Sequence, residues 1–150
     1  MRIKHILFSL FFIVCTFPTY SQTYKAYVNA GEGAFNNGDY YSAKNYYMRA
    51  LEFDIEDPEI SFKTAEASRL FNDYYAGAYY YNQTVRLDKD KHFPLAMFWL
   101  ATMNKMMGEY ETAKNLFYQY YNLHPADSNY YSQRAAREIK DCEMAHGMMT

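Results

Sequence analysis

Apolar and small residues recur at helical spacing along most of the chain, and short polar turns separate the segments that carry them. Tyr40, Ala43 and Tyr47, for example, are three and four residues apart and fall on one face of a helix. The pattern predicts helices over residues 24–37, 40–54, 58–71, 74–87, 94–107, 110–122 and 128–145.

The residues between these segments carry the start and stop signals of helices. Gly38 and Asn72 each tolerate the left-handed backbone conformation that ends a helix. Asp57 is a good N-cap, and Pro58 suits the first helical position. Asp127 is placed to cap the last helix. These local signals support the boundaries that the hydrophobic pattern predicts.

The turns recur at a nearly constant interval. Gly38 and Asn72 are 34 residues apart, and Asn72 and Gly108 are 36 residues apart. The charged connection 88–92 holds the two extra residues. This period predicts stacked helical hairpins in an all-α solenoid, with an ordinary helical bundle as the alternative. The three hairpins and a polar C-terminal cap are expected at about 24–57, 58–93, 94–127 and 128–145.

The first 21 residues have the anatomy of a secretory signal peptide. Arg2 and Lys4 precede an apolar run of 12 residues, 6–17, and Thr19 and Ser21 place small residues before a cut at Gln22. A membrane anchor is the alternative, but 12 residues are too few to span a bilayer that needs about 20. Lipidation at Cys15 is a further alternative. We expect residues 22–146 to form the exported domain, periplasmic or outer-membrane-associated.

Composition narrows the partner classes. Losing Arg2 and Lys4 with the signal would leave 13 basic and 17 acidic residues, with no basic block. Nucleic acid and anionic membranes are therefore poor candidates as partners. Cys142 would be the only cysteine left, either as a small apolar helix residue or in an intermolecular bridge. The 18 Tyr and 11 Phe residues suit the half-buried surfaces of a thin solenoid.

Catalytic and metal chemistry find little support. His92, His124 and His146 are scattered and have no partner at metal-ligand spacing. Asp54, Glu56, Asp57 and Glu59 form an acidic cluster, whose spacing differs from that of a calcium loop. Helix capping accounts for two of these carboxylates, and a bound cation is the alternative. We expect a protein that is not an enzyme and has no cofactor or metal.

The hairpin pattern resembles the tetratricopeptide repeat (TPR) over about residues 24–125. Small residues that let two helices approach recur at repeat positions 8 and 20, as Gly31, Ala65, Ala101, Ala43, Gly77 and Ala113. Aromatic residues recur at positions 17 and 24, as Tyr40, Tyr74, Tyr110, Tyr47, Tyr81 and Phe117. Ser61, Thr64 and Ser68 depart from the pattern in the second unit. The resemblance implies a right-handed superhelical solenoid.

The same resemblance implies a concave groove lined by the first helix of each hairpin. The residues expected to bind a partner there are Phe35, Phe62, Glu66, Arg69, Phe98, Thr102 and Lys105. Such a set suits an extended or helical peptide with apolar and charged contacts. The alternative is that the aromatic residues pack against the next hairpin. Val28 and Glu32 replace the Lys and Asn of the clamps that hold a C-terminal carboxylate, which excludes that subtype.

A looser resemblance concerns the whole chain. A signal peptide followed by a Tyr- and Asn-rich repeat domain is similar to the N-terminal region of Bacteroidetes-type OmpA-family envelope proteins. It implies a non-catalytic adaptor or scaffold in an envelope or secretion assembly. The alternative is a glycan-binding module of an outer-membrane sugar-capture system, although Trp99 is the only Trp and is expected to be buried.

Overall fold

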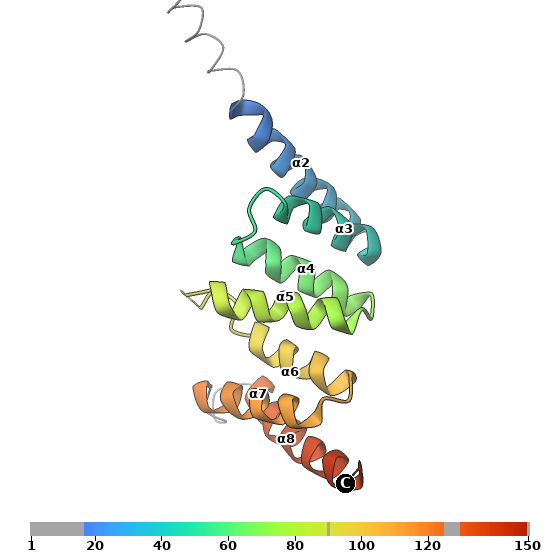
Figure 1. The fold of residues 1–150 in the computed structure, drawn as a ribbon, viewed down its shortest axis with the longest axis vertical. Helices are drawn as coiled ribbons and strands as arrows, with labels where there is room; N and C mark the ends of the chain where they lie inside the picture. The colour runs from blue at the N-terminus through green and yellow to red at the C-terminus, as the bar shows by residue number, and fades with distance from the viewer. Residues whose placement is uncertain (1–16, 90, 125–129, 150) are drawn as a thin grey trace, which may run out of the picture.

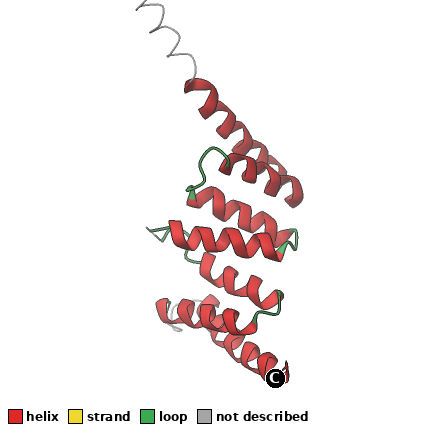
Figure 2. Cartoon of the chain, viewed as in Figure 1, coloured by secondary structure: helices red, strands yellow, loops and turns green. Residues whose placement is uncertain are grey.

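The computed structural model describes residues 17–89, 91–124 and 130–149. In these ranges the regular structure is entirely α-helical, as Figure 2 shows. The helices are α2 (Phe17–Asn36), α3 (Tyr40–Leu51), α4 (Pro58–Leu70), α5 (Tyr74–Leu87), α6 (Ala96–Met106), α7 (Tyr110–Leu123) and α8 (Tyr130–Met149). Most of the predicted signal peptide, 1–16, and the predicted cap Asp127 lie outside the described residues.

Each helix packs mainly against the helices before and after it in the chain. The extensive pairs are α2 with α3, α4 with α5 and α6 with α7, joined by α3–α4, α5–α6 and α7–α8 contacts. Figure 1 shows the helices following one another down a single elongated stack. This quasi-one-dimensional arrangement confirms the predicted all-α solenoid of three hairpins plus a last helix.

The three hairpin turns share one backbone geometry. Gly38, Asn72 and Gly108 have φ values of 77°, 63° and 83°, in the left-handed region. In each turn the residue after the left-handed one donates its backbone N–H to the carbonyl five residues earlier. Asp39 donates in this way to the Ala34 carbonyl at 2.9 Å, and Asp73 donates to the Ser68 carbonyl at 2.9 Å. The left-handed conformation predicted at Gly38 and Asn72 is thus confirmed. It ends each helix in a geometry in which carbonyl groups of the last helical turn accept hydrogen bonds from the turn.

Aspartate side chains start three of the helices. Asp39 accepts from the Ser42 N–H at 3.0 Å, and Asp73 caps α5 in the equivalent place. The predicted cap Asp57 accepts from Glu59 N–H at 2.9 Å and from Ile60 N–H at 3.0 Å, with Pro58 in the first helical position. These bonds satisfy amide groups that have no partner inside the helix.

Four predicted boundaries are wrong by at least two residues. α2 begins at Phe17 rather than 24, seven residues early, and α8 ends at Met149 rather than 145. The other two are wrong by two or three residues. α3 ends at Leu51 rather than 54, where Phe53 N–H bonds the Ala50 carbonyl at 3.0 Å in a tighter turn. α6 begins at Ala96 rather than 94, because the Asp88 carboxylate accepts from His92 N–H at 2.9 Å and from Phe93 N–H at 2.7 Å. These side-chain bonds hold the α5–α6 connection in a non-helical course.

The core follows the repeat. The buried aromatic residues Tyr47, Tyr81 and Phe117 each belong to a different one of three successive hydrophobic clusters. Small residues lie against these aromatic rings or against the residues next to them. Gly31, for example, lies against the Tyr47 ring. The absence of a side chain at these points lets paired helices approach closely.

α8 closes the stack with an amphipathic surface. Ala135, Ile139 and Cys142 are buried and join the cluster formed by α6 and α7, whereas Arg137 and Lys140 are exposed. Burial raises the pKa of the Cys142 thiol, in keeping with a small apolar core residue. A polar outer face is what the terminal helix of a solenoid requires.

Candidate partner-binding surface

The first helices of successive hairpins, α2, α4, α6 and the equivalent α8, are linked to one another by side chains. Lys63 on α4 pairs with Glu32 on α2. Arg69 on α4 lies over the Trp99 ring of α6, 4.2 Å from its centroid. We call the surface formed by α2, α4, α6 and α8 the first-helix face. Its cross-links join residues about one repeat apart, so the face is continuous along the stack.

The α4 part of this face holds a polar cluster, in which Tyr81 is buried and Glu66 and Arg69 are half-buried. Arg69 pairs with Glu66 at 2.6 Å and donates to the Tyr81 hydroxyl at 3.1 Å, while Tyr81 donates to Glu66. Burial, followed by the charge of Glu66 and the hydrogen bond to it, raises the pKa of Tyr81 well above its ordinary value. The cluster fixes the Glu66 and Arg69 side chains in one geometry.

The raised pKa of Tyr81 should make the fold less stable at high pH. In the unfolded chain this tyrosine ionises near pH 10, whereas the folded chain keeps it neutral, so the stabilisation is complete below about pH 10 and is lost above it. Above that pH the free energy of unfolding should fall by about 1.4 kcal/mol per pH unit more steeply in the native protein than in Tyr81→Phe. Urea unfolding measures both slopes. If the free energy of unfolding fell equally steeply with pH in the two proteins, the pKa of Tyr81 would not be raised in the folded state.

The α6 part of the face is connected to α8. Lys105 pairs with Glu138 at 2.6 Å and with Asp141 at 3.3 Å, and Arg134 pairs with Glu138 at 3.3 Å. Burial alone would lower the pKa of Lys105, but its bonds to Glu138 and Asp141 outweigh burial and raise it. Arg134 also lies 5.8 Å from the centroid of Trp99, which is therefore flanked by two guanidinium groups.

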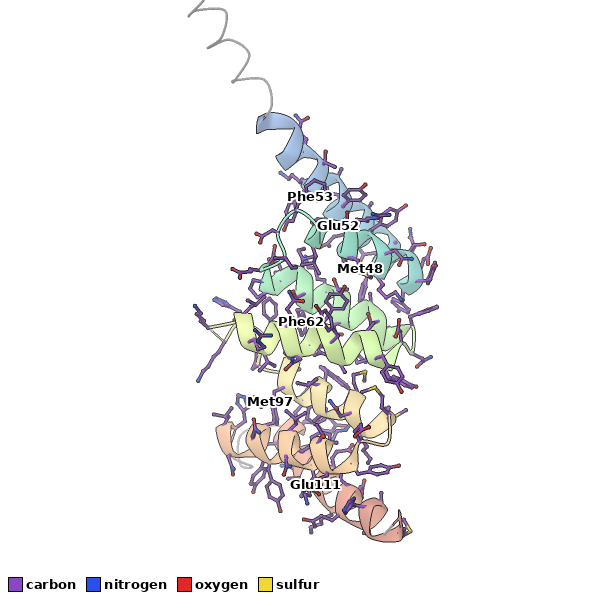
Figure 3. All side chains as sticks on the ribbon, viewed as in Figure 1. Met48, Glu52, Phe53, Phe62, Met97 and Glu111 are labelled. Carbon is purple, nitrogen blue, oxygen red and sulfur yellow. The ribbon has the colours of Figure 1, made fainter. Side chains whose placement is uncertain are left out.

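Two of the aromatic residues expected to bind a partner are half-buried. Phe35 meets the Tyr40 ring edge-on at 5.3 Å. Phe62, labelled in Figure 3, stacks on Phe93 at 4.7 Å and contacts Tyr81 at 6.0 Å. Each ring therefore packs against another ring of its own or the next hairpin and leaves only part of its surface for a partner.

Phe98 does not line the surface as expected. Its side chain is 0% exposed and lies 5.1 Å from the Tyr131 ring, 5.4 Å from Phe117 and 5.5 Å from Tyr120. α8 supplies Tyr131 and so helps to enclose it. Thr102, one turn further on, is half-buried and donates its hydroxyl to the Phe98 carbonyl at 2.9 Å. The expected stripe of three exposed phenylalanines is therefore reduced to Phe35 and Phe62.

The sequence interpretation missed the contribution of α8. Arg134, Glu138 and Asp141 carry the first-helix face one unit further, although the sequence predicted only a polar cap there. A signal was available, because these residues lie 36 positions after Phe98, Thr102 and Lys105, the same offset that separates Asn72 from Gly108.

Charges of both signs alternate on the first-helix face. Lys63, Arg69, Lys105 and Arg134 are each paired with a carboxylate. The face therefore presents no field of a single sign, which an anionic ligand such as a nucleic acid would need.

The acidic cluster near the second hairpin has a structural explanation. Asp57 accepts two backbone N–H bonds and a third bond from the Tyr24 hydroxyl at 2.5 Å, and burial together with Asp57 raises the pKa of Tyr24. Over the described ranges, no three His, Cys, Asp or Glu side chains come together as metal ligands would. Nor does any helix within those ranges have the length and apolar character needed to cross a membrane.

Solved structures share this fold. The second TPR domain of human RPAP3, in complex with the HSP70 peptide SGPTIEEVD, superposes with a TM-score of 0.67 at 21% identity, covering 83% of this chain and 98% of that one. The Yersinia enterocolitica type III secretion chaperone SycD, in complex with a peptide of the translocator YopD, gives 0.65 at 16% identity, covering 85% and 94%.

A type III secretion complex from Aeromonas hydrophila gives a TM-score of 0.69 at 15% identity, covering 92% of this chain and 89% of that one. The chain is therefore a TPR-like solenoid in fold. No protein-family model and no curated protein matches its sequence.

Proposed function

We propose that this chain is a non-catalytic protein-interaction domain, an adaptor or scaffold that binds a segment of a partner protein along the first-helix face. The observation that carries the proposal is the continuity of that face over α2, α4, α6 and α8, maintained by the cross-links from Glu32–Lys63 to Lys105–Glu138. A preorganised surface of this kind loses little conformational entropy when it binds an extended or helical segment.

The structural neighbours support the same class of function. Two of them are solved with a bound peptide, from HSP70 and from YopD. We extend the general property, peptide binding by a TPR solenoid, to this chain. The signal-like segment 1–21 and the loose likeness to OmpA-family envelope proteins lead us to propose an envelope or secretion assembly as the setting.

The contacts of the face suggest how a partner would bind. Because its charges already pair with one another, attraction to a single-sign partner is weak, and affinity would rest on apolar burial at Phe35 and Phe62. The half-buried Glu66, Arg69 and Lys105 would set the register by hydrogen bonds from fixed positions. Thr102 lies on α6, one turn before Lys105.

Thr102→Arg should weaken partner binding by about tenfold or more, because a long cation at this position obstructs the face and leaves the fold intact. The matched control is Thr112→Arg, which makes the same change on the exposed surface of α7. The partner is first captured from envelope extract and identified, and its affinity for each purified full-chain variant is then measured by calorimetry. Circular dichroism checks folding.

Equal affinity of both variants for the captured partner would show that the partner binds elsewhere. Failure to capture any protein, with the chain folded, would count against the interaction function itself.

A further inference from the structure

A surface hollow lies away from the first-helix face, between α5 and the loop that joins α3 to α4. Its volume is about 220 Å³. It is lined by Ile55, Glu56, Tyr79, Asn82, Gln83, Arg86 and Leu87. Tyr79, Asn82, Gln83 and Arg86 are spaced at three, four and seven residues, so one stripe of α5 forms the floor. The loop from the preceding hairpin forms the opposite wall.

Both walls are held in place. Gln83 donates its side-chain amide to the Ile55 carbonyl at 2.5 Å, which ties the loop to α5. The Tyr79 ring stands perpendicular to Tyr80, with the ring centroids 4.9 Å apart, and this contact restricts its rotation. Tyr79 is nevertheless 63% exposed. The hollow is therefore a formed site with an aromatic ring available to a ligand.

The polar groups at this site suit a neutral ligand rich in hydroxyl groups. Glu56 offers acceptors, Arg86 offers donors and Asn82 offers both, and all three side chains are exposed. One negative and one positive group face the same hollow, so its net charge is close to zero. A phosphate or carboxylate would need an excess of cations, and a metal ion would need more carboxylates.

We propose that this hollow is a saccharide-binding subsite, one that accepts a neutral pyranose unit. A pyranose has a face of C–H groups that packs on an aromatic ring such as Tyr79, and its hydroxyl groups both donate and accept hydrogen bonds. The volume is below the range of roughly 300–1,000 Å³ typical of sites for drug-sized ligands, which fits a single ring. The site shares none of its lining residues with the first-helix face and does not depend on the proposed interaction function.

This subsite differs from a sugar site built on the only tryptophan. The guanidinium group of Arg69 lies 4.2 Å from the centroid of the Trp99 ring, and that of Arg134 lies 5.8 Å from it. The Trp99 ring is therefore already covered by protein groups. The exposed aromatic residue that lines the hollow is Tyr79.

The test is a titration of the full chain, followed by NMR, with glucose, N-acetylglucosamine and the β-1,4-linked trimer of each. At least one of the four should bind saturably, with a Kd of about 1 mM. Tyr79→Ala should weaken that binding about tenfold, through loss of the ring. The control is Tyr75→Ala on the same helix, since Tyr75 is 79% exposed but does not line the hollow.

Three results would overturn the proposal. The first is that none of the four sugars binds up to roughly 50 mM, far above the expected Kd. The second is that Tyr79→Ala and Tyr75→Ala weaken binding equally. The third is that glucose 6-phosphate binds more tightly than glucose, which would show an anion site. The Thr102→Arg result is independent of all three.

Discussion

Phe98→Ala is expected to lower the free energy of unfolding by about 3–5 kcal/mol, the range measured for a fully buried phenylalanine. Phe98 is 0% exposed and its ring meets Phe117, Tyr120 and Tyr131, so the truncation leaves a cavity between α6, α7 and α8. For a domain of this size the loss is comparable to much of the total stability. Urea unfolding followed by circular dichroism measures it.

The matched control is Phe71→Ala. Phe71 is 46% exposed and contacts the Tyr41 ring at 5.3 Å, so truncation there removes only about half as much buried surface, leaves no enclosed cavity and should cost about 1–1.5 kcal/mol. If Phe98→Ala instead kept its stability and lost partner binding, Phe98 would be a binding residue after all. α8 would then have to move away when a partner binds.

Gly31→Val should destabilise the first hairpin by about 3 kcal/mol, near the upper end of overpacking effects. A Cβ at position 31 would lie 2.5 Å from a ring carbon of Tyr47, which is only 2% exposed and has no space to withdraw. α2 would therefore have to move away from α3. Thermal unfolding of the variant and the native protein gives the difference.

Two comparisons show that the effect comes from this contact. Gly33→Val makes the same change on the same helix, where nothing lies within 4 Å of the new Cβ, and should alter stability by no more than about 0.5 kcal/mol. Adding Tyr47→Ala to Gly31→Val should cost less than the sum of the two single changes, because the clash is gone. Additive losses would contradict the close approach.

The class of fold and the hairpin turns follow from short-range sequence signals. The left-handed Gly38 and Asn72 and the cap at Asp57 depend on residues within one turn of helix, so their patterns are visible along the chain. Repetition of these patterns every 34 to 36 residues then predicts a stack. Cleavage at Gln22 and an envelope location stay predictions.

The candidate binding residues were harder to predict, because exposure depends on what the neighbouring helix covers. Periodicity assigns Phe62 and Phe98 to the same repeat position, yet Phe62 is half-buried and Phe98 is fully enclosed. The difference arises from the next first helix, since α8 brings Tyr131 against Phe98. A repeat pattern gives the face of a helix but not the side chains that pack onto it.

The sequence by itself determined the helices, the turns and their order in the stack, because these depend on local backbone preference and on the spacing of apolar residues. Only the tertiary structure decided which side chains remain available. The pairing of Lys105 with Glu138, the placement of Trp99 beside Arg69 and the hollow at Tyr79 each join residues of different helices. Such contacts depend on the packing angle between hairpins, which the sum of many side-chain contacts sets.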